Sequence, residues 1–305
     1  MIPKRILIFG EGQLGSAYRD YFRARGVEAV NTKVDIRNAA LVASAVREAK
    51  PDLVMNCVAK ADIDWCERNR LEAFDVNVLG ADLIAGAAHD HGAYLVHISS
   101  GCVQESLTAD EIHTEDDAPH PLCYYSWTKV WAENLILERG RRRGLKALVL
   151  RPRQLLSAKL SPRNALVKML TYSKFIDTPN SCTVVEDLLA VTDELVRKDA
   201  VGLVNVVNPG VTTPHRIATL LKLHVRPEMA FSKMSKEELN AMTFAKRIDA
   251  VLSTDRLASY GITLKPLEER LVEVLADLKK NLAGADAAAV MARTAEDTKK
   301  KLLVT

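Results

Sequence analysis

The chain has 305 residues, of which 48% are hydrophobic and 27% are charged, as is usual for a soluble globular protein. Its formal net charge of +3 is too small to indicate a nucleic-acid partner. No apolar stretch approaches the ~20 residues that a membrane-spanning helix needs, so we expect neither nucleic acid nor a membrane as a partner.

Five cysteines are scattered along the chain, and none forms a C-x-x-C pair. Their spacing does not predict a metal site, and we expect no metal. The apolar run near the N-terminus stops at glycines, which is typical of a buried strand rather than a signal peptide. Scattered thiols without a signal peptide indicate a reducing, cytoplasmic location.

Short apolar runs predict strands at 5–10, 27–31, 52–59, 94–100, 146–152 and 202–208. They are apolar almost throughout, as strands covered on both faces must be. Amphipathic segments between them, such as 41–50, 81–92 and 126–140, predict helices. This alternation predicts an α/β fold, namely a Rossmann-type doubly wound parallel sheet with a smaller C-terminal substrate-binding lobe.

The first strand runs into "GEGQLG" (10–15), which places Gly10, Gly12 and Gly15 at the start of a helix. Glycines at this spacing allow a tight turn, a close backbone approach to a pyrophosphate and close helix–strand packing. A glycine turn that only connects the two elements is the alternative. Its position after a strand favours dinucleotide binding.

The second strand ends near Lys33, where NAD-binding sites usually carry an acidic residue. A cation there suits a 2′-phosphate, so we expect NADPH rather than NAD. Asp35, two residues further on, is expected near the adenine.

The strand at 94–100 ends in Ser99 and Ser100, which Gly101 and Cys102 follow. Tyr125 and Lys129 lie four residues apart and share a face of the next helix. A Y-x-x-x-K spacing alone is common by chance. The Tyr125–Lys129 pair is more informative because it follows a glycine turn and a strand that ends in two serines.

From about residue 153 the strand–helix rhythm loosens and prolines interrupt the chain. We therefore predict an NADP-binding domain at 1–152 with returning segments near 175–208, and a mainly substrate-binding lobe at 153–283. The alanine- and charge-rich stretch 284–305 predicts a terminal helix or a tail.

Together, "GEGQLG", "KPDLVMNCVAKADIDWCE", "FDVNVLG", "HISSGCV", "YYSWTK" and "NALVKML" resemble an extended short-chain dehydrogenase/reductase of the dTDP-4-dehydrorhamnose reductase branch. Further segments resemble the nucleotide-rhamnose synthases, which are UDP-4-keto-6-deoxyglucose 3,5-epimerase/4-reductases: "DWCE" (64–67), "SGC" (100–102), "SPRNALVKMLTYSK" (161–174), "TPNSCTVVEDLL" (178–189) and "NPG" (208–210). The similarity extends from residue 5 to about residue 275.

The resemblance implies roles for individual residues. Tyr125 would protonate the sugar O4, Lys129 would lower the tyrosine pKa and hold the nicotinamide ribose, and Ser100 would bind the carbonyl oxygen. The implied cofactor-binding residues are Gly10, Gly12, Gln13, Leu14, Gly15, Lys33, Asp35, Ile36, Cys57, Ala59, Asn77, Tyr125 and Lys129. The implied contacts to a nucleotide-sugar substrate are Ser100, Gly101, Cys102, Asn164 and Arg247. A homodimer is also expected.

Cys102 decides whether one reaction or two is expected. The ketone at C4 makes the C3 and C5 hydrogens acidic, and inverting both centres needs a base and a proton donor. In the rhamnose synthases a cysteine at the Cys102 position and a lysine at the Lys168 position are the implicated pair. The alternative is a buried structural thiol, which is the commoner role of cysteine.

Some residues depart from the family pattern. The glycine loop is one residue shorter than the usual G-x-x-G-x-x-G, and Asp249 and Ala250 replace two expected asparagines near Arg247. Two alternatives therefore stay open beside the bifunctional enzyme. One is a reductase without epimerase activity, and the other is a dinucleotide-binding regulatory subunit.

Overall fold

The computed structural model describes residues 1–303, with side chains through residue 298. It divides into two compact units. The first comprises residues 1–103, 115–151 and 189–205, and the second comprises 104–114, 152–188 and the chain from Val206 onward. These boundaries differ from the expected ones, because 104–114 joins the second unit and the returning segment is 189–205. The reason is strand pairing, since β5 (Ile112–His113) pairs with β12 (Val251–Leu252).

The first unit is built on a six-stranded sheet with the order β10-β6-β4-β3-β1-β2. All six strands match predicted runs, and the pairs β2–β1, β1–β3, β3–β4 and β4–β6 are parallel. The strands are β1 (Arg5–Phe9), β2 (Glu28–Thr32), β3 (Leu53–Asn56), β4 (Tyr94–Ile98), β6 (Ala147–Pro152) and β10 (Gly202–Val206).

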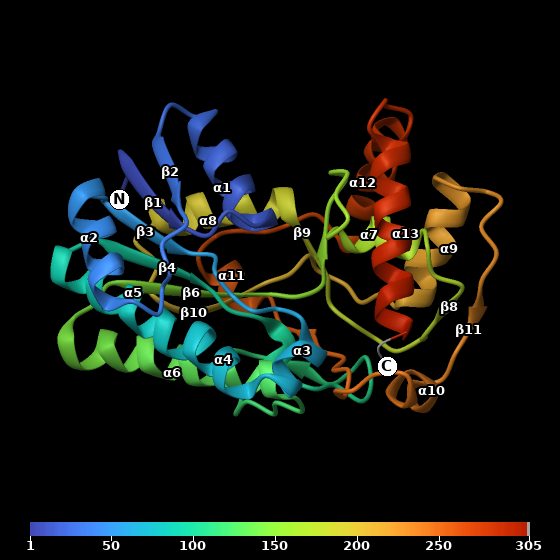
Figure 1. Ribbon diagram of the computed structural model, residues 1–305, viewed down its shortest axis with the longest axis horizontal. Coiled ribbons are helices and arrows are strands. Elements are labelled where there is room, and N and C mark those ends of the chain that lie inside the picture. The colour runs from blue at the N-terminus through green and yellow to red at the C-terminus, as the bar shows by residue number, and fades with distance from the viewer. Residues whose placement is uncertain (304–305) are drawn as a thin grey trace. The chain divides into compact units, whose positions relative to one another are not determined.

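Helices cover both faces of this sheet (Figure 1). On one face α2, α5 and α6 contribute Val42, Ile84 and Ile136 to a core that also contains strand residues. On the other face α1 and α8 lie together, and the Tyr18 hydroxyl is 2.7 Å from Thr192 Oγ1. The helical elements are α1 (Gln13–Arg23), α2 (Ala39–Ala49), α3 (Ile63–Arg68), α4 (Arg70–Phe74), the π-helix η1 (Asp75–Leu79), α5 (Gly80–His91), the 3-10 helix η2 (Gly101–Val103), α6 (Tyr124–Arg143) and α8 (Val185–Arg197).

The second unit packs helices around a separate apolar core. Leu166 of α7, Leu221 of α9 and Leu275 of α12 are fully buried in it. Its helices are α7 (Ala165–Met169), α9 (Pro214–His224), α10 (Lys236–Ala241), α11 (Asp255–Ser259), α12 (Leu267–Leu282) and α13 (Ala287–Leu303). Three two-stranded parallel sheets complete it: β5–β12, β7 (Leu155–Leu156) with β9 (Thr183–Val184), and β8 (Lys174–Phe175) with β11 (Ser232–Lys233).

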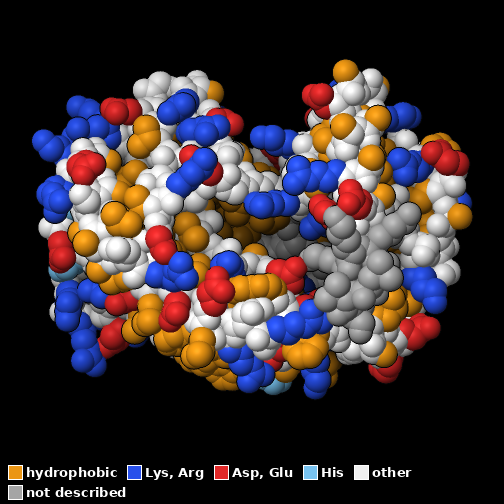
Figure 2. All heavy atoms as spheres, in the orientation of Figure 1, with side chains coloured by type: hydrophobic (Ala, Val, Ile, Leu, Met, Phe, Trp, Pro, Cys, Tyr) orange, Lys and Arg blue, Asp and Glu red, His pale blue; other side chains and the backbone are white. Residues whose placement is uncertain are grey.

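The predicted terminal segment is helical as α13, and residues 304–305 lie outside the described residues. Over the face of the first unit drawn in Figure 2, basic and acidic side chains are interspersed. Within residues 1–303, no helix combines the length and apolarity that crossing a membrane requires.

Candidate functional site

The order of the strands places a candidate site at the carboxyl ends of β1 and β3. The chain leaves β1 toward β2 on one side and returns to β3 on the other side of β1. In open α/β sheets, ligands bind in the crevice outside the carboxyl ends of the strands at such a reversal. The glycine turn lies at this point, because α1 begins at Gln13, directly after Gly12.

The glycine turn is tight enough to require glycine at two positions. Gly10 has φ of +103°, a conformation that side chains disfavour. A Cβ at Gly15 would lie 2.1 Å from the Gly10 carbonyl oxygen. The Asn31 side chain donates to that same oxygen at 2.6 Å and so fixes the turn.

The same turn fits a pyrophosphate. Gly12 is the N-cap of α1, and no side-chain hydrogen bond caps the helix at this residue. The first amides of the helix and the helix dipole attract an anion. Gln13 and Leu14 follow as the first helical residues. A dinucleotide therefore fits the donors that this chain offers.

Charged side chains flank the end of β2. Lys33 forms an ion pair of 2.7 Å with Glu11 of the glycine turn. Asp35 binds Arg37 through two hydrogen bonds, and this pairing lowers the pKa of the Asp35 carboxyl to about 2. Arg37 is a second cation in this region, which sequence reasoning missed because only Lys33 directly follows the strand.

The remaining residues predicted to contact the cofactor differ in how deeply their side chains are buried. Cys57 follows β3, its backbone amide donates to Phe9, and its carbonyl group approaches Gly10. Burial raises the pKa of the Cys57 thiol to about 12, so the thiol is uncharged at neutral pH. Ala59 is partly exposed in the same loop. The Ile36 side chain belongs to the core.

Tyr125 and Lys129 lie in the first turns of α6, and Ser100 follows the end of β4 and hydrogen-bonds to Tyr125. Lys129 is 1% exposed, and its Nζ donates to the Ile98 carbonyl oxygen at 2.9 Å. Burial lowers the pKa of Lys129 to about 8, although Glu133 opposes the shift. Burial raises the pKa of the Tyr125 phenol, Cys102 adds to this rise, and the hydrogen bond with Ser100 reduces it.

Cys102 lies on η2 beside these groups. It is 8% exposed, and its backbone amide donates to the Ser100 hydroxyl at 3.2 Å. Cys66 and Cys123 also interact electrostatically with Tyr125. Burial raises the pKa of both thiols, so the phenol lies among thiols from three different segments. Sequence spacing gave no sign of this clustering.

Asn77 holds the Tyr–Lys helix in place from the π-helix η1. Its amide oxygen accepts from the Lys60 backbone amide at 2.7 Å, and its amide nitrogen donates to the Lys60 carbonyl at 3.0 Å. The same nitrogen donates to Thr128 Oγ1 at 3.0 Å. Since Thr128 in turn donates to the Tyr125 carbonyl, Asn77 connects the loop after β3 to the first turn of α6. Single π-turns are frequent at functional sites.

The other predicted site residues lie in the second unit. Asn164 caps α7, and its buried side chain accepts from Leu166 and donates to the Ser157 and Lys159 carbonyls. Lys168 is on the same helix and half-buried, and Arg247 is also half-buried. Since Cys102 belongs to the first unit, its pairing with Lys168 stays a prediction, as do the substrate contacts of Asn164 and Arg247.

A cavity of about 290 Å³ lies beside α7, and sequence reasoning did not indicate it. It is mainly apolar, with one cation, Lys174, among the side chains that line it. The lining includes Met169, Tyr172, Phe175, Ile217 and Leu239. Among the described residues, no group of three or more His, Cys, Asp or Glu side chains could hold a metal ion.

A family model described as the RmlD substrate binding domain matches residues 4–280 of the chain. The chain belongs to the RmlD substrate binding domain family. This match confirms the resemblance that the sequence motifs indicated.

Named relatives of this RmlD-family chain include two plant proteins and one viral protein. A bifunctional dTDP-4-dehydrorhamnose 3,5-epimerase/dTDP-4-dehydrorhamnose reductase of Arabidopsis thaliana is 25% identical over 285 residues, which cover 90% of this chain and 93% of that protein. A trifunctional UDP-glucose 4,6-dehydratase/UDP-4-keto-6-deoxy-D-glucose 3,5-epimerase/UDP-4-keto-L-rhamnose-reductase of the same plant is 27% identical over 290 residues; the match covers 90% of this chain but only 42% of that protein.

The crystal structure of the L780 UDP-rhamnose synthase from Acanthamoeba polyphaga mimivirus matches with a TM-score of 0.81. It is 26% identical, and the match covers 89% of this chain and 98% of that chain. This match confirms the predicted fold class.

Proposed function

We propose that this RmlD-family chain is an NADPH-dependent reductase of a nucleoside-diphosphate 4-keto-6-deoxyhexose that forms a nucleotide-linked rhamnose. The observation that carries the proposal is the convergence of Ser100, Tyr125 and Lys129 beside the glycine turn. The names of the plant and viral relatives support the substrate class. A regulatory subunit would not need this set of three side chains.

Tyr125 is suited to act as the acid. The raised pKa of its phenol keeps it protonated at neutral pH, so it can donate a proton to the sugar O4 as the carbonyl is reduced. Ser100 holds the phenol by a hydrogen bond and is placed to bind the carbonyl oxygen. When bound, NADPH supplies the hydride for C4.

Lys129 supplies positive charge next to the reacting groups. Its pKa of about 8 keeps the amino group mostly protonated at pH 7. A cation near Tyr125 stabilises the phenolate that remains after proton transfer. The hydrogen bond to the Ile98 carbonyl fixes the position of the amino group.

Selectivity for NADPH over NAD rests on Lys33 and Arg37. Both follow β2, and each is paired with a carboxylate, Glu11 or Asp35. A 2′-phosphate would compete for these cations. The Lys33→Ser variant should lose affinity for NADPH while its affinity for NADH changes little.

The cavity beside α7 is suited to the base of the nucleotide sugar. Aromatic and aliphatic side chains line it, and a planar base stacks well on Tyr172 or Phe175. Its volume of about 290 Å³ leaves the diphosphate and the sugar outside it. The Lys174 ammonium group, at its edge, would face the diphosphate.

The first experiment is NADPH consumption with UDP-4-keto-6-deoxyglucose and with dTDP-4-keto-6-deoxyglucose. Turnover with one of them supports the epimerase/reductase and identifies the nucleotide. Turnover only with an already epimerised keto sugar identifies a reductase without epimerase activity. If neither kind of keto sugar is reduced, the enzymatic proposal is wrong.

We also propose that Cys102 and Lys168 act together in 3,5-epimerisation before reduction. The support is that the Cys102 backbone amide donates to the Ser100 hydroxyl and that Cys102 interacts electrostatically with Tyr125, so a ketone bound by these two residues would have its neighbouring carbons near Cys102. In heavy water without NADPH, the wild-type protein should exchange deuterium into C3 and C5 of the keto sugar. Cys102→Ser should block the exchange but still reduce an epimerised substrate, whereas Cys182→Ser, in the core of the second unit, controls for loss of a buried thiol elsewhere. Wild-type protein that shows no exchange rules out the epimerase.

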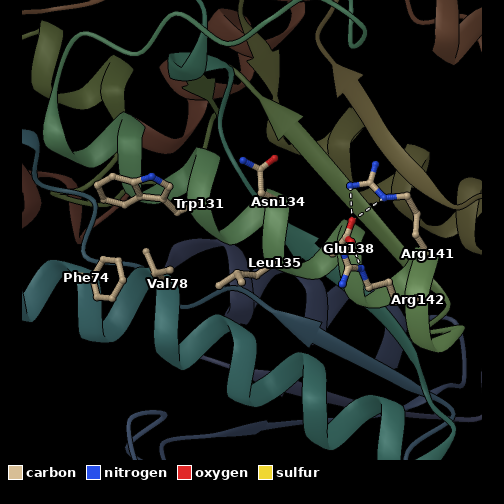
Figure 3. A pocket seen from close by; sticks show the side chains of 8 residues that line it. All are labelled: Phe74, Val78, Trp131, Asn134, Leu135, Glu138, Arg141 and Arg142. Carbon is tan, nitrogen blue, oxygen red and sulfur yellow. Dashed lines mark hydrogen bonds and ion pairs between the residues drawn. The ribbon is translucent and has the colours of Figure 1, made fainter.

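The outer face of α6 supports the proposal of a homodimer. It carries a shallow cavity of about 670 Å³ lined by Phe74, Val78, Trp131, Asn134, Leu135, Glu138, Arg141 and Arg142 (Figure 3). Leu135 in this lining, and Leu79 and Trp127 nearby, are each at least 40% exposed, so this face carries several accessible apolar side chains. A two-fold axis would cover this face with its own copy. Leu135→Arg should convert a dimer into a monomer in analytical ultracentrifugation, and a monomeric wild type would contradict the proposal.

A further inference from the structure

A buried carboxylate lies one helical turn beyond Lys129. Glu133 is 2% exposed, and Arg151 of β6 donates to it through Nε at 2.9 Å and through Nη2 at 2.6 Å. The Ser99 hydroxyl donates to the same carboxylate. Three donors in the protein interior therefore hold one negative charge, a stronger arrangement than a solvent-exposed ion pair.

This carboxylate joins the elements that carry the reacting groups. Ser99 immediately precedes Ser100, and its backbone amide donates to the Leu150 carbonyl at 2.7 Å. Lys129, on the same helix as Glu133, donates to the Ile98 carbonyl. The end of β4 is thus attached to both β6 and α6. Moving Glu133 would disturb Ser100 relative to Tyr125.

Glu133 also interacts electrostatically with Lys129 and raises the pKa of its amino group. On α6 the two residues are four positions apart, a spacing that brings their side chains to the same face. Three of the groups around Lys129 are uncharged at neutral pH, since burial raises the pKa of the Cys57 and Cys66 thiols and lowers the pKa of His97. The groups that face Lys129 are Glu133 on α6, Cys57 after β3, Cys66 on α3, His97 on β4, Cys102 on η2 and, through Glu133, Arg151 on β6.

We infer that Glu133 is a positioning residue for the reductase, which fixes Ser100 against the Tyr–Lys helix and keeps Lys129 cationic at neutral pH. The inference rests on the proposed function. If the Glu133–Arg151 ion pair were purely structural, replacing it would change only the stability of the protein. Replacement of a buried pair by apolar residues of similar volume is often neutral or stabilising. The proposed role also changes the pH dependence of the reaction.

The test compares the pH profile of kcat in the wild type and in Glu133→Gln. Loss of the carboxylate should move the alkaline limb, where Lys129 loses its proton, to lower pH by about one unit. At pH 8 kcat should fall roughly fivefold, because the protonated fraction of Lys129 drops from about one half to about one tenth, while the KM for NADPH changes little. Glu194→Gln is the matched control, because Glu194 pairs with Lys198 at the same four-residue spacing but in solvent. This variant should keep the wild-type profile.

A second variant separates positioning from folding. Glu133→Leu combined with Arg151→Met removes both charges and keeps apolar volume, so the protein should fold while the alkaline limb remains shifted. An unshifted limb in both variants would overturn the inference.

The inference can also be tested without turnover. NMR titration of the Lys129 side chain should show a lower pKa in Glu133→Gln than in the wild type. An equal titration midpoint in the two proteins would overturn the inference. Absence of turnover in the wild type would overturn only the proposed function.

Discussion

The substitution Gly15→Ala tests the glycine turn most directly. An alanine Cβ at this position lies 2.1 Å from the Gly10 carbonyl oxygen and 3.0 Å from its carbonyl carbon. The Asn31 amide nitrogen, which donates to that oxygen, is 3.3 Å from the added methyl group. The two shortest contacts are with the Gly10 backbone, which cannot rotate away as a side chain can, so the turn itself must open.

The cost follows from two physical effects. Overpacking a rigid contact destabilises it by about 1–3 kcal/mol, and loss of the hydrogen bond from Asn31 to Gly10 costs about 0.5–1.5 kcal/mol. If opening the turn misplaces the amides that face the pyrophosphate, the combined ~2–4 kcal/mol weakens cofactor binding. At 1.4 kcal/mol for each factor of ten, the Kd for NADPH should rise roughly 30- to 700-fold.

The assay is a fluorescence titration of NADPH, with the thermal stability of each variant measured in parallel. Gly86→Ala is the control, because a Cβ at Gly86 meets only the Arg139 guanidinium atoms at 3.8 Å. That variant should bind NADPH normally and gain about 0.5–1 kcal/mol of helix stability. A Kd for Gly15→Ala within twofold of the wild type would refute the assignment of the turn to the cofactor.

Three further predictions concern single side chains. Lys129→Met should abolish reduction yet raise the free energy of unfolding at pH 7 by about 1–3 kcal/mol. The sign follows from the pKa of Lys129, which is about 8 in the folded protein, so that below pH 8 folding buries a charged amino group and loses stability. The variant avoids this loss, and its advantage should shrink as the pH rises toward 10.5, the pKa of lysine in the unfolded chain. Asn77→Ala leaves the Lys60 backbone amide without its partner, although Cys66 Sγ still donates to the Lys60 carbonyl, and should cost about 1–3 kcal/mol in urea unfolding. Backbone amides of Arg5 and Lys4 lower the pKa of Asp52, so the wild type should exceed Asp52→Asn in stability at neutral pH, and the difference should vanish as pH falls through the lowered pKa of the folded state. A difference between these two proteins that is independent of pH would contradict this reasoning.

Local patterns in the sequence predicted the sheet and its turn. The six strands are continuous apolar runs because both faces of the sheet are covered, and such runs are visible without knowledge of the partners. The glycine spacing and the Tyr125–Lys129 spacing are likewise short-range signals, and their segments lie where the motifs indicated.

Pairings between distant segments could not be predicted in the same way. Glu133 and Arg151 are on different elements, and neither residue is unusual in its local sequence. The loop at 104–114 joins the second unit because β5 pairs with residues about 140 positions further along the chain. Cys66 and Cys123 look like ordinary core thiols in the sequence, and only the folded chain places them near Tyr125.

Because of the π-helix at Asp75–Leu79, the position of Asn77 depends on the number of residues between β3 and α5. A π-turn holds one residue more than the 3.6 of an α-helical turn. Deleting one residue there would restore a regular helix but rotate everything after it by about 100°, which would turn Asn77 away from Lys60 and Thr128. Homologous chains that keep this asparagine should therefore keep the extra residue as well, even where the surrounding helix has diverged.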